Sequence, residues 1–316
     1  MTCNAYIFPG QGSQIVGMGQ SLCDAYDVAR DTFAEADEVL GWGLSQLCFS
    51  GPAEALTDTR RAQPAILTTS IAAFRALQSM RPDLPPPSFM AGHSLGEYSA
   101  LVVSSALRFA DAVRLTRTRG EVMAQAGEQH PGSMAAILKL DDEQVAALCA
   151  EAALATGDVV QVANYNAPGQ VVISGGKAGI KAAADLAVAA GGRPRILAVS
   201  IAAHSALMQP AATEFAVAVS ATPFATPDTP VVGNIHAQAL TSADAIRAEL
   251  VAQLTSPVRW TASVRHMAQA GVDRFVEIGP GSVLTGLVKR IEPDVATENV
   301  AEAGDVASAL LQGEGR

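Results

Sequence analysis

Ser94 lies in the pentapeptide Gly92-His93-Ser94-Leu95-Gly96, which matches the G-x-S-x-G pattern of a nucleophilic serine on a sharp turn. The apolar run at 88–91 predicts a strand before it, and we predict a helix from about Glu97. This context would expose the Ser94 hydroxyl, while the backbone N–H of Leu95 at the helix N-terminus could stabilise an oxyanion. A chance Gly-Ser turn is the alternative in a chain with 27 glycines, but the strand–turn–helix context favours catalysis.

A catalytic serine requires a base, and histidine is the usual one. His204 follows a strand predicted at 195–199 and keeps the order of serine before histidine found in hydrolase-like folds. The spacing favours His204 over His236 without excluding either, and a structural role is the alternative for both. The five histidines are His93, His130, His204, His236 and His266.

Arg119 is the most informative charged residue. In the helix predicted over 110–123 it shares a face with Leu115, Val122 and Met123. An arginine on an apolar face needs an anionic partner, because an unpaired buried charge is very costly. That partner could be a protein carboxylate or the carboxylate of a substrate, bound by both arms of the guanidinium. Position alone leaves these alternatives open.

The loop at 8–14 follows a predicted first strand at 5–8 and contains Gly10, Gln11 and Gly12. It lacks the G-K-[ST] ending of a phosphate-binding loop and the glycine spacing of a dinucleotide site. A backbone N–H of this loop could instead provide a second oxyanion donor.

Short apolar strands alternate with amphipathic helices along the chain, which predicts an α/β protein. Residues 128–199 follow the order strand, helix, two hairpin strands, helix and strand, which is the ferredoxin-like motif. We therefore predict a small domain at 128–199, inserted into a large domain formed by 1–127 and 200–316. Its predicted strands are 134–140, 159–164, 171–174 and 195–199, and its helices 141–153 and 177–190. We expect the tail after Val300 to be partly mobile.

The composition fits a globular protein with a large core, with 49% hydrophobic and 16% charged residues among 316. A formal net charge of −10 disfavours nucleic-acid binding. No apolar stretch reaches the roughly 18 residues of a membrane span, and the N-terminus lacks a signal-peptide pattern. The four cysteines are widely spaced and predict neither a disulfide framework nor a metal site. We expect free thiols and a cytoplasmic location.

Taken together, these segments resemble the malonyl-CoA:acyl carrier protein transacylases and, more widely, the acyltransferase domains of fatty-acid and polyketide synthases. The resembling segments occur in order along nearly the whole chain: FPGQGSQ at 8–14, Gln63-Pro64-Ala65, GHSLGEYSA at 92–100, Arg119-Gly120 with Met123, NAPGQVVISG at 166–175, HSALM at 204–208, 253–260 and EIGPGSVLTGLVKRI at 277–291.

The resemblance implies a hydrolase-like large domain and transfer of a malonyl group from malonyl-CoA to the phosphopantetheine thiol of an acyl carrier protein, by a ping-pong mechanism. It implies that Ser94 is acylated, that His204 is its base and that Arg119 binds the malonyl carboxylate. No metal and no other cofactor is implied, since coenzyme A enters as the thioester of the substrate.

The family has no acidic third member in its catalytic set. The resemblance implies that the backbone carbonyl of Gln253 orients the histidine instead, and that Gln11 and Leu95 supply the N–H groups of the oxyanion hole. Relatives specific for malonyl or methylmalonyl often carry bulkier or hydroxylated residues in the segment that ends at the histidine. Here Ala203 is small, so the pocket could admit a larger α-substituent.

Other functions stay open beside this one. A stand-alone acyltransferase serving a polyketide synthase would share the chemistry and differ in its carrier partner or acyl group. An acyl hydrolase is disfavoured by Arg119, whose charge a neutral acyl chain would leave unpaired. A non-catalytic scaffold is disfavoured by the intact set of Ser94, His204 and Arg119.

Overall fold

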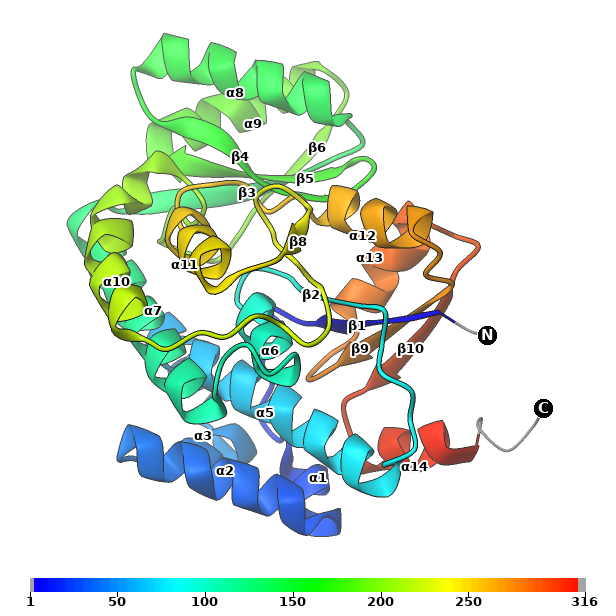
Figure 1. Cartoon of the computed structure of the whole chain (residues 1–316). Coiled ribbons are helices and arrows are strands. Elements are labelled where there is room, and N and C mark those ends of the chain that lie inside the picture. Colours follow the sequence, from blue (N-terminus) through cyan, green and yellow to red (C-terminus); the bar gives the residue numbers. More distant parts are fainter. Residues whose placement is uncertain (1–2, 312–316) are drawn as a thin grey trace.

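Two β-sheets organise residues 3–311, which is the part of the chain that this computed structural model describes (Figure 1). The larger sheet has the strand order β10-β9-β1-β2-β7-β8 and is parallel except for its last pair. Its strands are β1 (Asn4–Phe8), β2 (Phe89–Gly92), β7 (Val231–Val232), β8 (Ala239–Leu240), β9 (Arg274–Ile278) and β10 (Ala296–Val300).

The central strand β1 separates two hydrophobic cores. Tyr6 and Phe8 belong to the core on one side of the sheet, while Ala5 and Ile7 belong to the core on the other side. Successive side chains of a strand point to opposite faces, so a strand covered on both faces needs an uninterrupted apolar sequence. The centre of the sheet is therefore a buried support for the loops that follow its strands.

Helices cover both faces of this sheet. The long helix α5 (Thr59–Met80) packs beneath it and is buried along most of its length, and α12 (Trp260–Gln269) and α13 (Val283–Ile291) pack on the opposite core. The remaining helices around this sheet are α1 (Gln20–Ala25), α2 (Asp27–Leu40), α3 (Leu44–Ser50), α4 (Ala53–Thr57), α6 (Gly96–Val103), α7 (Phe109–Gln129), η1 (Ala206–Met208), α10 (Gln209–Ala221), α11 (Ala243–Ala252) and α14 (Ala303–Leu311).

The smaller sheet has the order β4-β5-β3-β6, and every neighbouring pair in it is antiparallel. Its elements follow one another as β3 (Gly132–Leu138), α8 (Asp142–Thr156), β4 (Val160–Ala167), β5 (Gln170–Gly176), α9 (Lys177–Ala189) and β6 (Arg193–Ile196). Both helices lie on one side of this sheet, at the top of Figure 1. They enclose a separate core.

The last strand of the small sheet differs from its prediction. The last strand of the small sheet was predicted at 195–199, but β6 pairs with β3 only from Arg193 to Ile196. As an edge strand it has no second neighbour to extend the ladder, and the chain leaves the sheet to line a cavity. In the tail expected to be partly mobile, Ala303–Leu311 form α14, where Val306 is fully buried, and residues 312–316 lie outside the described part. Among the described residues, no helix is long and apolar enough to cross a membrane.

Candidate active site

The turn between β2 and α6 holds Ser94 in a strained backbone conformation, with φ at 52°. Two close backbone approaches explain the glycines around it. A Cβ on Gly92 would lie 1.9 Å from the Gly96 carbonyl carbon, and one on Gly96 would lie 2.0 Å from the carbonyl oxygen of Phe8. Only glycine fits at either position, so the sequence pattern directly reflects the tight turn that presents the serine.

Ser94 and His204 come together although 110 positions separate them. The Ser94 Oγ lies 2.9 Å from the His204 Nε2, and the His204 Nδ1 lies 2.8 Å from the backbone oxygen of Gln253. A carbonyl can only accept, so Nδ1 carries the proton and a neutral ring leaves Nε2 free to accept from the serine hydroxyl. Burial, followed by the positive charge of Arg119, lowers the pKa of His204 to about 3. The imidazole is therefore neutral, as a general base must be.

Arg119 lies on α7 and is 1% exposed. Its Nη1 donates to the Gln63 Oε1 at 2.8 Å, and its Nη2 donates to the Gln253 Oε1 at 2.8 Å and to the Ser94 Oγ at 3.1 Å. All three partners are neutral, and no carboxylate within residues 3–311 forms an ion pair with this guanidinium. The sequence left two partners open for Arg119, a protein carboxylate and a substrate carboxylate. The described residues form no salt bridge of the first kind.

The two N–H groups assigned to an oxyanion hole are both without protein acceptors in the described chain. Neither the N–H of Gln11, in the loop after β1, nor that of Leu95, at the start of α6, donates to another residue there. The side chain of Gln11 is tied to α5, because its Oε1 accepts from the Thr59 hydroxyl at 2.9 Å. This contact fixes the loop on the Ser94 side of the sheet.

A cavity of about 910 Å³ opens over Ser94 between the two sheets. Gln11 from the loop after β1, Ser94 from the turn after β2 and Arg119 from α7 line one side of it, and the smaller sheet contributes apolar side chains such as Met134 and Val172. The segment 197–204, which links the two sheets, supplies a further wall that includes Ala203, and α13 adds Val283 and Leu287. Its volume is that of a small-molecule binding site.

Three polar residues of this region were given no role by the sequence reasoning. Asn234 accepts the N–H of Ser94 with its Oδ1 at 2.7 Å, and its own amide donates to the Gly92 carbonyl and the Glu97 Oε2. Glu97 is fully buried, and burial raises its pKa well above the usual range. Gln63 and Glu97 lie in segments that resemble the family, so this resemblance could have pointed to them. Asn234 lies outside every such segment, and nothing in the sequence pointed to it.

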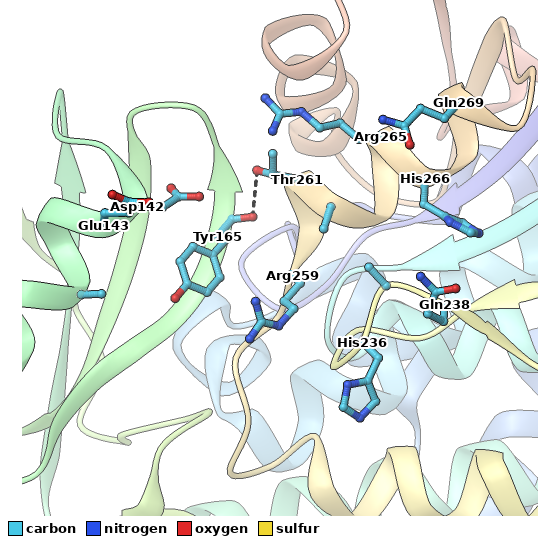
Figure 2. A pocket seen from close by; sticks show the side chains of 13 residues that line it. Asp142, Glu143, Tyr165, His236, Gln238, Arg259, Thr261, Arg265, His266 and Gln269 are labelled. Atoms are coloured by element: carbon cyan, nitrogen blue, oxygen red, sulfur yellow. Dashed lines mark hydrogen bonds between the residues drawn. The ribbon is translucent and has the colours of Figure 1, made fainter.

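A second hollow, of about 560 Å³, lies apart from Ser94 and is shown in Figure 2. His236 faces this hollow together with Arg259, whose guanidinium lies 5.6 Å from the Tyr165 ring centre. Neither Ser94 nor Arg119 lines it. His236 is therefore not the base for Ser94. His93 adjoins Ser94 in the sequence, and its Nε2 lies 2.8 Å from the Asn166 Oδ1 rather than beside the Ser94 hydroxyl.

Comparison with known proteins places this chain in a family. The model described as the acyl transferase domain matches residues 5–308. The chain belongs to the acyl transferase family. It is 47% identical over 311 residues to the malonyl CoA-acyl carrier protein transacylase of Escherichia coli (strain K12), covering 98% of this chain and 99% of that protein.

Solved structures of the family have the same architecture. An acyl carrier protein S-malonyltransferase from Vibrio cholerae O1 biovar eltor str. N16961 superposes with a TM-score of 0.93 at 44% identity, covering 98% of this chain and 100% of that one. A malonyl-transacylase in complex with its type II PKS acyl-carrier protein gives a TM-score of 0.94 at 44% identity, with the same coverage. The mixed α/β fold with two sheets is thus that of the family.

Proposed function

We propose that this protein transfers a malonyl group from malonyl-CoA to the phosphopantetheine thiol of an acyl carrier protein. The observation that carries the proposal is Arg119, a fully buried guanidinium with only neutral protein partners, 3.1 Å from the Ser94 hydroxyl. A buried charge of this kind is costly unless an anion answers it. An acyl group that bears its own carboxylate supplies that anion beside the nucleophile, and the names of the relatives agree with malonyl.

The reaction would proceed in two half-reactions through an acyl-serine. His204 takes the proton of Ser94 as the Oγ attacks the thioester carbonyl, and the N–H groups of Gln11 and Leu95 stabilise the oxyanion. The carbon–sulfur bond then breaks, and the proton on His204 passes to the departing thiolate of coenzyme A. The carrier thiol attacks the ester by the reverse sequence, with His204 as its base. Binding of the acyl carboxylate by Arg119 fixes the ester and disfavours attack by water.

The two sheets correspond to two domains in this proposal. We infer a hydrolase-like large domain from 1–127 and 200–316, with a ferredoxin-like small domain inserted at 128–199. The support for the small domain is its β-α-β-β-α-β succession together with the antiparallel strand order. Placing the cavity between the two domains would let the small domain cover the acyl group bound to Ser94.

The four free cysteines are compatible with a reducing compartment such as the cytoplasm.

A stand-alone acyltransferase of polyketide synthesis is the second candidate. It is favoured by the similarity to the malonyl-transacylase solved with its type II PKS acyl-carrier protein. The residues around Ser94 would perform the same chemistry for either carrier. An acyl hydrolase is less well supported, because a neutral acyl chain would leave Arg119 without an anion.

Intact-mass analysis tests the proposal directly. The protein is incubated with malonyl-, methylmalonyl-, acetyl- and succinyl-CoA, and the mass gain and its location are measured. Addition of carrier proteins bearing phosphopantetheine, from fatty-acid and polyketide systems, then reports which carrier removes the acyl group. Malonyl on Ser94, discharged to a carrier thiol, is the expected result. Label on another residue, or release only as free malonate, would overturn the assignment.

A further inference from the structure

The side chain of Gln253 lies at the centre of the hydrogen-bond network behind Ser94. It is fully buried, at the C-terminal end of α11. Its Oε1 accepts from the Arg119 Nη2 at 2.8 Å, while its Nε2 lies 3.2 Å from the Ser94 carbonyl oxygen and 3.2 Å from the Glu97 Oε2. The backbone oxygen of the same residue accepts from His204. One glutamine thus contacts the nucleophile, the base and the arginine.

The chemistry of its neighbours fixes which way this amide points. A guanidinium has five donors and no acceptor, so the atom facing Arg119 must be the amide oxygen. The NH₂ group then faces two oxygens, the carbonyl of Ser94 and the carboxyl of Glu97. A flipped amide would set donor against donor and acceptor against acceptor. The orientation is therefore determined by the network rather than by packing alone.

The contact with the Ser94 carbonyl bears on the oxyanion hole. In a trans peptide the C=O and the N–H point in opposite directions, so holding the Ser94 carbonyl also directs the N–H of Leu95. The Glu97 N–H donates to the same carbonyl at 3.2 Å. Hydrogen bonds that a carbonyl accepts polarise its peptide group and strengthen the N–H as a donor. This peptide is the one that carries the free N–H of Leu95.

We propose that the Gln253 side chain is a positioning residue that aligns two parts of the site at once. Its Nε2 aims the oxyanion donor of Leu95, and its Oε1 aims the Arg119 guanidinium at the acyl carboxylate. This role is distinct from that of the backbone carbonyl, which orients His204 and survives any substitution at position 253. The Arg119 half of the proposal rests on the proposed malonyl transfer, whereas the Leu95 half requires only that Ser94 is the nucleophile.

The test uses the full-length protein and two probes. Acylation by malonyl-CoA reports both halves. Phenylmethanesulfonyl fluoride has no carboxylate and reports Ser94, His204 and the oxyanion hole alone: the Ser94 oxygen bonds to sulfur, fluoride leaves, and His204 takes the proton. Gln253→Met keeps the length of the side chain and removes both polar atoms. The matched variant is Gln63→Met, which removes an acceptor from Arg119 and a donor to the Thr59 hydroxyl. It removes no hydrogen bond to Ser94, and the Thr59 hydroxyl keeps its own bond to the Gln11 Oε1.

For Gln253→Met we expect sulfonylation to slow about 10-fold and malonyl acylation to slow about 100-fold. The first figure is smaller than the 10²–10³-fold loss typical of deleting an oxyanion donor, because the Leu95 N–H is still present. For Gln63→Met we expect malonyl acylation to slow about 10-fold and sulfonylation to stay within about twofold of the wild type. The pH dependence of sulfonylation should not change in Gln253→Met, because the carbonyl that orients His204 remains.

Three results would overturn the proposal. Sulfonylation within about twofold of the wild type in Gln253→Met would refute control of the Leu95 donor. An equal loss of sulfonylation in Gln253→Met and Gln63→Met would mean that the loss comes from disturbed packing. A changed pH dependence of sulfonylation in Gln253→Met would mean the same. If Gln253→Met does not fold, the same-sized Gln253→Glu replaces the donor to Ser94 with an acceptor and must show the same sulfonylation loss. If the wild type is sulfonylated on Ser94 but takes no malonyl group, the proposed function is refuted. Sulfonylation of the variants then still tests whether Gln253 aligns the Leu95 donor.

Discussion

Replacing Arg119 by alanine separates a transferase for carboxylate-bearing acyl groups from a general acyl enzyme. Arg119 is 1% exposed, its three hydrogen-bond partners are uncharged side chains, and the Tyr98 ring centre lies 5.8 Å from the guanidinium carbon. Its desolvation is already a cost of the folded state, and Gln63 and Gln253 hold it in one orientation. An acyl carboxylate therefore meets a preorganised cation and has little ordering left to impose.

The expected magnitude follows from this burial. Deleting one partner of a buried charge pair costs about 2–5 kcal/mol, which corresponds to roughly 30- to 5,000-fold. Because the guanidinium is almost wholly shielded from water and its orientation is fixed, we expect the upper part of this range. The value of kcat/KM for malonyl-CoA should fall about 1,000-fold in Arg119→Ala, or about 4 kcal/mol. Acetyl-CoA lacks the carboxylate, so its transfer should stay level or rise.

The assay measures kcat/KM for malonyl-CoA and acetyl-CoA in the wild type, Arg119→Ala and Arg119→Lys. Lysine keeps the charge but not the planar fork, so it should recover only part of the malonyl activity. Thermal unfolding of each variant serves as the control for folding. Equal losses with the two substrates in a folded alanine variant would mean that Arg119 supports the site structurally, and carboxylate selection would be refuted.

The site supports five further predictions. Ser94→Ala should abolish the malonyl adduct seen by intact mass, and an adduct that persists would place the nucleophile elsewhere. The small Ala203 should allow detectable but slower acylation by methylmalonyl-CoA, since one methyl group changes pocket binding by only about 1–3 kcal/mol; no adduct at saturation would show that other residues close the pocket. Because burial lowers the pKa of His204 to about 3, sulfonyl fluoride labelling should stay nearly constant from pH 8 to 5, and a fall centred near 6.5 would contradict a neutral buried base. The same shift should lower folding stability as the pH drops below 6.5, since the unfolded chain takes up a proton that the folded chain refuses. Gly96→Ala should lower the urea midpoint sharply or prevent folding, because its Cβ would lie 2.0 Å from a β1 carbonyl oxygen, while Gly286→Ala, with open space around its Cβ, should not.

Much of the local structure was predictable because short-range rules govern it. The strand before Ser94 follows from the apolar run that ends at Ala91, and the turn and helix after it follow from Gly92 and Gly96. A capping box of Asp141 and Gln144 opens α8 where the helix was predicted to begin, since this motif needs only two residues three positions apart. The end of β6 was misjudged because its pairing stops at Ala135, although β3 continues to Gly132, and the chain beyond Ile196 lines the cavity; the apolar sequence alone does not show this change of role.

The pairing of functional groups required the tertiary structure. The sequence offered His204 and His236 as bases, and only the path of the chain between the sheets sets one ring 2.9 Å from the Ser94 hydroxyl and the other in a separate hollow. It likewise left the partner of Arg119 open. Burial and the absence of an ion pair in the described chain decided that question, because both depend on what α5 and α11 bring to the guanidinium.

The sequence by itself determined the chemistry that each residue type can perform and the turn that exposes Ser94. It could not determine the role of the Gln253 side chain, whose three polar partners lie 134, 156 and 159 positions away along the chain. Hydrogen bonds act over about 3 Å, so such contacts exist only after the sheets and helices have packed. Motifs are set by neighbours in sequence, whereas the alignment of nucleophile, base and arginine is set by neighbours in space.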